Sequence, residues 1–161
     1  MRIIDGYNVI GAAAGLGLAL SQPDKEDRLL RLLARFRFRR RSREPMTVVF
    51  DGHHGRLAAG PRRYSHMGID VEYALGESAD AAIARKVRAA ARPRELEVVT
   101  SDQLVLRTVE SSGARGTRSP VFLAEVSRAL AEGAEGAEGE KPEAPGPAEV
   151  AEWLDRFRDG G

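Results

Sequence analysis

The chain has 161 residues, of which 42% are hydrophobic and 30% are charged, and this composition suits one globular domain with a single core. It contains no cysteine, which excludes disulfides, thiolate metal sites and cysteine nucleophiles. The formal net charge of +1 favours no class of partner. Because the sequence shows neither a signal-peptide pattern nor an apolar run long enough to cross a bilayer, we expect a cytoplasmic protein without a membrane partner.

The first predicted strand, residues 2–4, is a short apolar run that ends at Asp5 and Gly6. Asp5 is therefore expected at the carboxyl end of a strand, which is the edge where open α/β sheets bind ligands. We predict that Asp5 is the first ligand of a metal site. The alternative is that Asp5 and Asn8 only stabilise a turn, as both residue types commonly do. Residues 11–20 predict a turn or a distorted helix that covers the strand end.

An amphipathic helix is predicted over residues 24–41, because leucines and a phenylalanine recur there at helical spacing. Its end is strongly basic, with six arginines in nine positions: Arg35, Arg37, Arg39, Arg40, Arg41 and Arg43. Cations at a helix C-terminus complement the helix dipole, which is one explanation. The number of arginines exceeds what such capping requires, so we predict a surface that contacts phosphates, with Arg37, Arg39, Arg40 and Arg41 in it.

The second predicted strand, residues 47–50, also ends in an acidic residue, Asp51. The basic segment that follows, residues 55–68, is predicted as a mobile loop. It carries Arg62, Arg63 and Tyr64, and its aromatic ring suits stacking on a nucleic-acid base. The alternative is an ordinary polar loop.

A third strand is predicted at residues 69–73, followed by a helix that begins at Ser78 and carries Asp80 in its first turn. Acidic residues favour that turn for electrostatic reasons alone, which is the structural explanation for Asp80. A fourth strand, residues 96–99, runs into Asp102, which is also a suitable cap for the helix that follows.

The remaining chain predicts a turn or short strand at residues 113–117 and a helix from Ser119 to about Glu132. We therefore place one domain at residues 1–132. Residues 133–147 are rich in Gly, Ala, Glu and Pro and predict a flexible linker. Residues 148–161 predict an amphipathic helix that docks through Trp153.

Alternating strands and helices predict an α/β fold with a mostly parallel central sheet flanked by helices. Asp5, Asp51 and Asp102 then end three strands, and Asp80 starts a helix after another. Clustered carboxylates repel one another, and a hard divalent cation such as Mg²⁺ or Mn²⁺ relieves that repulsion.

Four motifs together resemble the YacP-like group of NYN-domain proteins, which are relatives of the PIN-domain nucleases. The motifs are Asp5-Gly6-Tyr7-Asn8-Val9-Ile10-Gly11, Val49-Phe50-Asp51, Glu77-Ser78-Ala79-Asp80 and Thr100-Ser101-Asp102. The resemblance runs from residue 1 to about residue 131. It implies a single PIN-like domain and a Mg²⁺- or Mn²⁺-dependent endoribonuclease that hydrolyses RNA phosphodiester bonds with metal-activated water.

The resemblance also implies roles for individual residues. Asp5, Asp80 and Asp102 match the acidic core that binds metal and performs catalysis, and Asn8 supports the first loop of that site. Glu77 and Asp51 are auxiliary metal ligands. One departure is that Ala81, Ala82 and Ala84 stand where relatives often carry further acidic residues, so a second metal is expected to bind weakly.

Two other functions remain open from the sequence. One is a catalytically silent module that binds RNA, either mRNA or rRNA, or the ribosome, through its arginines and Tyr64. The other is a different α/β metal enzyme, such as a phosphatase. Tyr7 argues against the common aspartyl-phosphate type, which needs an Asp two residues after Asp5.

Overall fold

The computed structural model describes residues 1–52 and 62–135. The chain divides into two units, Met1–Leu130 and Ala131–Gly161, and the fold described below is that of the first unit. The predicted C-terminal helix with Trp153 lies outside the described residues, as do residues 136–147 of the predicted linker. Residues 133–135, also predicted as linker, belong to the last described helix. Among the described residues, no helix is long and apolar enough to cross a membrane.

In the described residues, six strands form one sheet at the centre of the domain. They are β1 (Arg2–Asp5), β2 (Met46–Asp51), β3 (Arg63–His66), β4 (Ile69–Ala74), β5 (Glu97–Val99) and β6 (Arg115–Thr117). The order across the sheet is β3-β4-β2-β1-β5-β6, and only β3 runs antiparallel to its neighbour. The mostly parallel α/β fold predicted from the sequence is confirmed.

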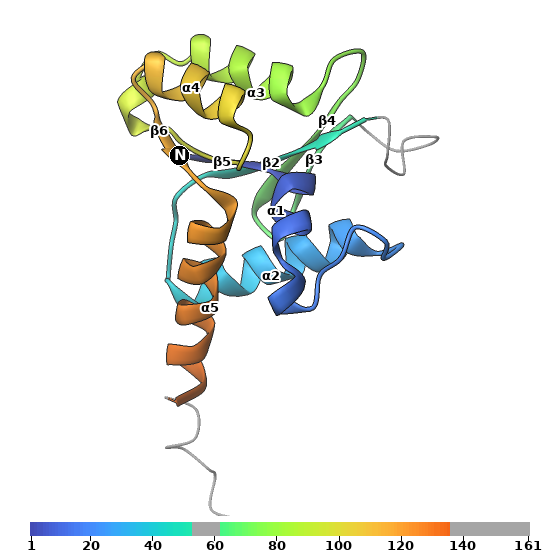
Figure 1. Ribbon diagram of the computed structural model, residues 1–161. Coiled ribbons are helices and arrows are strands. Elements are labelled where there is room, and N and C mark those ends of the chain that lie inside the picture. The colour runs from blue at the N-terminus through green and yellow to red at the C-terminus, as the bar shows by residue number, and fades with distance from the viewer. Residues whose placement is uncertain (53–61, 136–161) are drawn as a thin grey trace, which may run out of the picture. The chain divides into compact units, whose positions relative to one another are not determined.

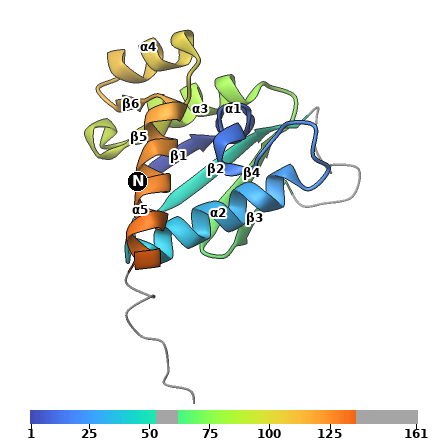
Figure 2. The same ribbon diagram turned by 60° about the horizontal axis from the view of Figure 1, so that its bottom comes forward.

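Helices cover both faces of this sheet, as Figure 1 shows. They are α1 (Gly6–Ala12), α2 (Lys25–Arg39), α3 (Ala79–Arg88), α4 (Gln103–Ser111) and α5 (Ser119–Glu135), with 3₁₀ turns at Ala14–Leu16 and Pro93–Glu95. α3 and α4 lie on one face, and α1, α2 and α5 lie on the other (Figure 2). β1 lies between strands reached by crossovers on opposite faces, which makes its carboxyl end the topological switch point where such sheets bind ligands.

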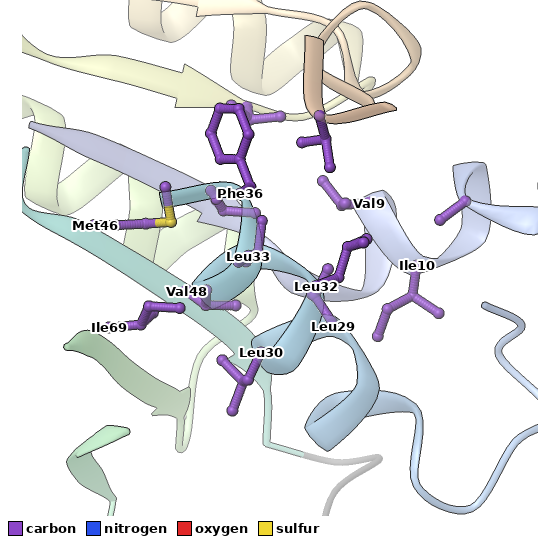
Figure 3. Close-up of a cluster of buried hydrophobic side chains, with 14 of the residues drawn as sticks. Val9, Ile10, Leu29, Leu30, Leu32, Leu33, Phe36, Met46, Val48 and Ile69 are labelled. Atoms are coloured by element: carbon purple, nitrogen blue, oxygen red, sulfur yellow. The ribbon is translucent and has the colours of Figure 1, made fainter. Parts of the chain in front are cut away.

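The larger core cluster lies on the α2 and α5 face of the sheet (Figure 3). α2 contributes the apolar stripe expected from its helical spacing, and all of these side chains are buried: Leu29, Leu30, Leu32, Leu33 and Phe36. Phe122 of α5 packs edge-on against Phe36 with ring centroids 5.7 Å apart. Burial of this stripe fixes α2 along the sheet, with Lys25 at one edge and Arg39 at the other.

The second core cluster lies on the α3 and α4 face and is built largely from small residues. α3 packs there through Ala79, Ala82, Ile83 and Val87, and α4 packs through Val105 and Val109. Alanines let α3 approach the sheet closely. As a result, the first turns of both helices are brought toward the carboxyl ends of the strands.

One predicted loop is wrong in part, because residues 63–66 form the edge strand β3 and not a loop. β3 pairs with β4 through a two-residue turn in which Met67 (φ 53°) and Gly68 (φ 73°) both have positive φ. This is the backbone that a tight hairpin of type I′ requires, and Gly68 was its only local signal. The strand escaped prediction because its side chains are mostly polar and exposed. Residues 53–61 of the predicted loop lie outside the described residues.

Candidate active site at the carboxyl edge of the sheet

Two of the predicted acids, Asp5 and Asp51, lie on the same face of the sheet. Side chains alternate along a strand, and Ile4 and Phe50 belong to the α2 and α5 cluster. Asp5 and Asp51 therefore point to the opposite face, which α3 and α4 cover. Parallel pairing of β1 with β2 brings both carboxylates to one edge.

The other two acids come from the helices on that face. Ser78 caps α3 by accepting a hydrogen bond from Ala81 N (3.2 Å), and this fixes Asp80 in the first turn. Asp102 caps α4, because its Oδ1 accepts hydrogen bonds from Leu104 N (2.8 Å) and Val105 N (3.0 Å). Its Oδ2 makes no hydrogen bond to a described residue, so capping leaves one carboxylate oxygen available.

All four acids line one pocket of about 460 Å³. Its other lining residues are Tyr7, Asn8, Leu20, Lys25, Ser78 and Ala79. The convergence expected from the sequence is thus present for Asp5, Asp51, Asp80 and Asp102, and Asn8 lies with them.

Asp5 is the most buried of these acids, with 6% of its surface exposed. Its Oδ1 accepts a hydrogen bond from Asn8 N (3.2 Å) and its Oδ2 accepts one from Thr100 Oγ1 (3.0 Å). Burial nevertheless raises the pKa of Asp5 to about 6, and the charges of Asp80 and Asp102 add to the rise. Burial, Asp102 and Asp51 likewise raise the pKa of Asp80. The carboxylates therefore repel one another across the pocket.

Asn8 has an orientation fixed by two donors. Its Oδ1 accepts hydrogen bonds from Ser101 N (2.8 Å) and from Ser119 Oγ (2.7 Å). Because a backbone N–H can only donate, the amide oxygen is identified without ambiguity. The Asn8 Nδ2 group makes no hydrogen bond to a described residue and is not buried, so it presents two N–H donors to the pocket.

Comparison with known proteins gives the family of the chain. The family model of the YacP-like NYN domain matches residues 2–155. The chain belongs to the YacP-like NYN domain family. Members of this family are PIN-like nucleases, and they generally use divalent metals.

Solved structures show the same fold. The crystal structure of Rae1 (YacP) from Bacillus subtilis matches with a TM-score of 0.64 at 22% identity, over 99% of this chain and 95% of that chain. A mutant of the same protein matches with a TM-score of 0.65 at 22% identity, over 81% of this chain and 77% of that chain. No curated protein matched the chain.

The donor chemistry of this YacP-like NYN domain fits a hard divalent cation, because four carboxylates share one pocket. Across the described residues, however, no three acidic or histidine side chains lie close enough to hold an ion by themselves. Mg²⁺ commonly keeps several waters and binds one or two carboxylates together with substrate phosphates. The pocket fits an open site of that kind, and the role of each acid as a ligand stays a prediction.

Glu77 was predicted as an auxiliary ligand, but it does not line the pocket of this NYN domain. Its carboxylate accepts a hydrogen bond from Arg85 (2.7 Å), and this arginine lowers its pKa. A carboxylate already paired with a guanidinium is a poor metal ligand, so the pair with Arg85 argues against Glu77 as an auxiliary ligand, and its role stays a prediction.

The arginines at the end of α2 lie at the opposite edge of the sheet from the acidic pocket. Lys25 lines the pocket at the start of α2, and Arg39 ends the helix about 21 Å away at 1.5 Å per residue. Arg37 donates to the Gly68 carbonyl, and Arg40 lies 3.7 Å from Glu125 of α5. The predicted RNA contact of this cluster is untested, and it is remote from the acids.

Tyr64 differs from the exposed stacking residue that was predicted. Its ring stacks on Tyr73 with centroids 6.5 Å apart and packs against the larger core cluster. Tyr73 OH in turn donates to Glu26 Oε2 (2.6 Å), while Tyr7 OH donates to Glu26 Oε1 (2.5 Å). Glu26 therefore fixes the Tyr7 ring on the pocket wall.

Three residues of the site were missed as functional from the sequence: Ser119, Lys25 and Glu26. Ser119 looked like a helix cap, and its hydrogen bond to Asn8 spans 111 positions, so no local pattern reveals it. Lys25 and Glu26 follow the predicted start of a helix, where charged residues are common. Only the packing of α2 against α1 brings them to the pocket.

Proposed function

We propose that this protein is a metal-dependent endoribonuclease that hydrolyses RNA phosphodiester bonds at the acidic pocket. The observation that carries the proposal is the convergence of Asp5, Asp51, Asp80 and Asp102 from four separate segments onto one pocket. Helix capping explains Asp102, but it does not explain why four carboxylates face each other at a cost in electrostatic repulsion. Membership of the NYN family, whose members are PIN-like nucleases, supports RNA as the substrate.

The acids of the pocket would hold Mg²⁺ or Mn²⁺, and Asp51, Asp80 and Asp102 are more exposed than Asp5. A bound divalent cation supplies Lewis-acid stabilisation of the phosphate and activation of the attacking water. Asn8 Nδ2 supplies uncharged hydrogen-bond donors for a phosphate oxygen, held in place by Ser101 and Ser119. The Tyr7 ring, fixed by Glu26, forms one wall of the pocket.

The test is RNA cleavage by the full chain with Mg²⁺, with Mn²⁺ and with EDTA. We expect cleavage only with a divalent cation. Asp102→Asn keeps the capping oxygen, so the protein should stay folded while the rate falls at least about a hundredfold, which is about 2.7 kcal/mol of transition-state stabilisation. Asp70→Asn is the matched control, because Asp70 is exposed on the same face of the sheet but lines no part of the pocket.

The outcomes separate the enzyme from an RNA-binding module. Equal cleavage by Asp102→Asn and Asp70→Asn would exclude the acidic pocket as the active site. If the unaltered chain binds RNA but cleaves none with either metal, the binding module is the correct function.

A further inference from the structure

A second cavity lies next to the acidic pocket and carries the opposite charge. It has a volume of about 470 Å³ and is lined by Arg62, Arg63, Glu77 and Arg85. Glu77 directly precedes Ser78, which lines the acidic pocket, so neighbouring residues of one segment line the two cavities. Arg62 and Arg63 lie beside Tyr73 and Glu72 of β4, so the basic cavity also lies toward the carboxyl ends of the parallel strands.

The arginines of this cavity come from separate parts of the fold. Arg62 and Arg63 stand at the start of β3, where Tyr73 N donates to the Arg62 carbonyl (3.0 Å). Arg85 comes from α3, and its guanidinium reaches back to Glu77 (2.7 Å). Folding thus brings three guanidinium groups together from two segments of the chain that are far apart in the sequence.

A buried carboxylate beneath the cavity holds these cations in position. Glu72 of β4 is 3% exposed and points toward α3. Lys86 Nζ lies 2.5 Å from Glu72, a guanidinium nitrogen of Arg63 lies at 3.0 Å, and one of Arg85 at 3.9 Å. With Arg62, whose charge acts on Glu77, four cationic side chains face the two carboxylates Glu72 and Glu77, which leaves a formal excess of two positive charges.

Arg62 acts on Glu77 only through its charge, which helps to lower the pKa of that carboxyl. Among the described residues its side chain makes no hydrogen bond or close ion pair, and it is exposed and lines the cavity. Guanidinium groups bind phosphates through paired N–H donors, and several of them in one cavity make a site for a phosphate group.

We propose that this basic cavity binds a backbone phosphate of the RNA strand next to the phosphate that enters the acidic pocket. The inference rests on the proposed ribonuclease function, because it takes the acidic pocket as the site of cleavage. The strand then runs from the acidic pocket over residues 77–80 into the basic cavity. The arginines of α2, at the far edge of the sheet, do not take part in this contact.

The test is the equilibrium binding of a labelled ten-nucleotide single-stranded RNA in EDTA, over a series of salt concentrations. Arg62→Ala should weaken binding severalfold and lower the slope of log K against log salt by about 0.7, because one phosphate contact is lost. Arg85→Ala should have a similar effect, checked against its melting curve because it also breaks the pair with Glu77. Arg94→Ala is the matched control, because Arg94 is exposed on the Pro93–Glu95 turn and lines neither cavity.

Because cleavage plays no part in this measurement, the cavity and the proposed function can fail separately. Unchanged affinity and salt slope in Arg62→Ala and Arg85→Ala would overturn the proposal, and so would a failure of the unaltered chain to bind RNA. Loss of binding in these variants, with no cleavage by the unaltered chain, would support the cavity and overturn the ribonuclease.

Discussion

Asp5→Asn should stabilise the protein near neutral pH while abolishing the proposed RNA cleavage. The carboxylate of Asp5 is buried, faces the charges of Asp80 and Asp102, and has a pKa raised from 3.8 to about 6. Above pH 6 the group is ionised in both the folded and the unfolded state, and the folded state carries the cost of burying the charge. Asparagine has a similar shape and no charge, so it removes that cost.

The size of the effect follows from the pKa shift. The rise of the Asp5 pKa from 3.8 to about 6 corresponds to about 3 kcal/mol of destabilisation at pH 7. Asparagine keeps an acceptor for Asn8 N, but the Thr100 hydroxyl must then accept from the new amide group and not donate. That hydroxyl then accepts from both the new amide group and Asp102 N (3.2 Å), and its own proton has lost its acceptor, which costs about 1 kcal/mol. We expect a net gain of about 2 kcal/mol in the free energy of unfolding.

The pH dependence gives the sign of the effect. The penalty of Asp5 is absent below pH 3.8, grows as the pH rises from 3.8 to the folded-state pKa of about 6, and is complete above it. Urea unfolding in EDTA at pH 4 and pH 7 should therefore show stabilisation by Asp5→Asn only at pH 7. The exposed control Asp70→Asn should show no such difference. Destabilisation by Asp5→Asn at pH 7 would refute the reasoning, because it would mean that the charge of Asp5 is favourably compensated.

Two further predictions concern residues outside the acidic set. Ser119→Ala removes one of the two donors that orient Asn8, so the rate of RNA cleavage should fall with little change in RNA affinity. The control Ser111→Ala affects only hydrogen bonds within α4 and should leave both quantities unchanged. An undiminished rate in Ser119→Ala would show that Asn8 needs no such support. Combined replacement of Arg39, Arg40 and Arg41 by Ala should lower the salt slope by about 0.7 per lost contact, but only for RNA long enough to span the distance of about 21 Å from the pocket. An unchanged slope with long RNA would assign these side chains to solvent, and a melting curve would verify the fold.

Much of the fold could be predicted because its strands are short apolar runs with clear ends. Ile3 and Ile4 run into Asp5, and Val98 and Val99 lead to Thr100 and the cap at Asp102. Such local signals place each acid at the carboxyl end of a strand or the start of a helix. Parallel pairing then brings them to one edge, and this step needs no knowledge of individual contacts.

Other parts of the site depend on long-range packing that no local pattern contains. Glu26 touches Tyr73 across 47 positions, and Glu72 collects cations from β3 and α3. The remote position of the α2 arginines follows only from the direction of that helix along the sheet. Glu77 seemed equivalent to its acidic neighbours until the structure paired it with Arg85.

The alternation of side chains along β1 limits how this site can evolve. Ile4 faces the α2 and α5 core and Asp5 faces the pocket, so one inserted or deleted residue in this four-residue strand would exchange the two. A carboxylate would enter an apolar cluster, and an isoleucine would replace it among the acids. A change in chain length within β1 would therefore disrupt both the core and the pocket. Substitutions around the two cavities, or length changes in the loops that border them, would leave this alternation intact.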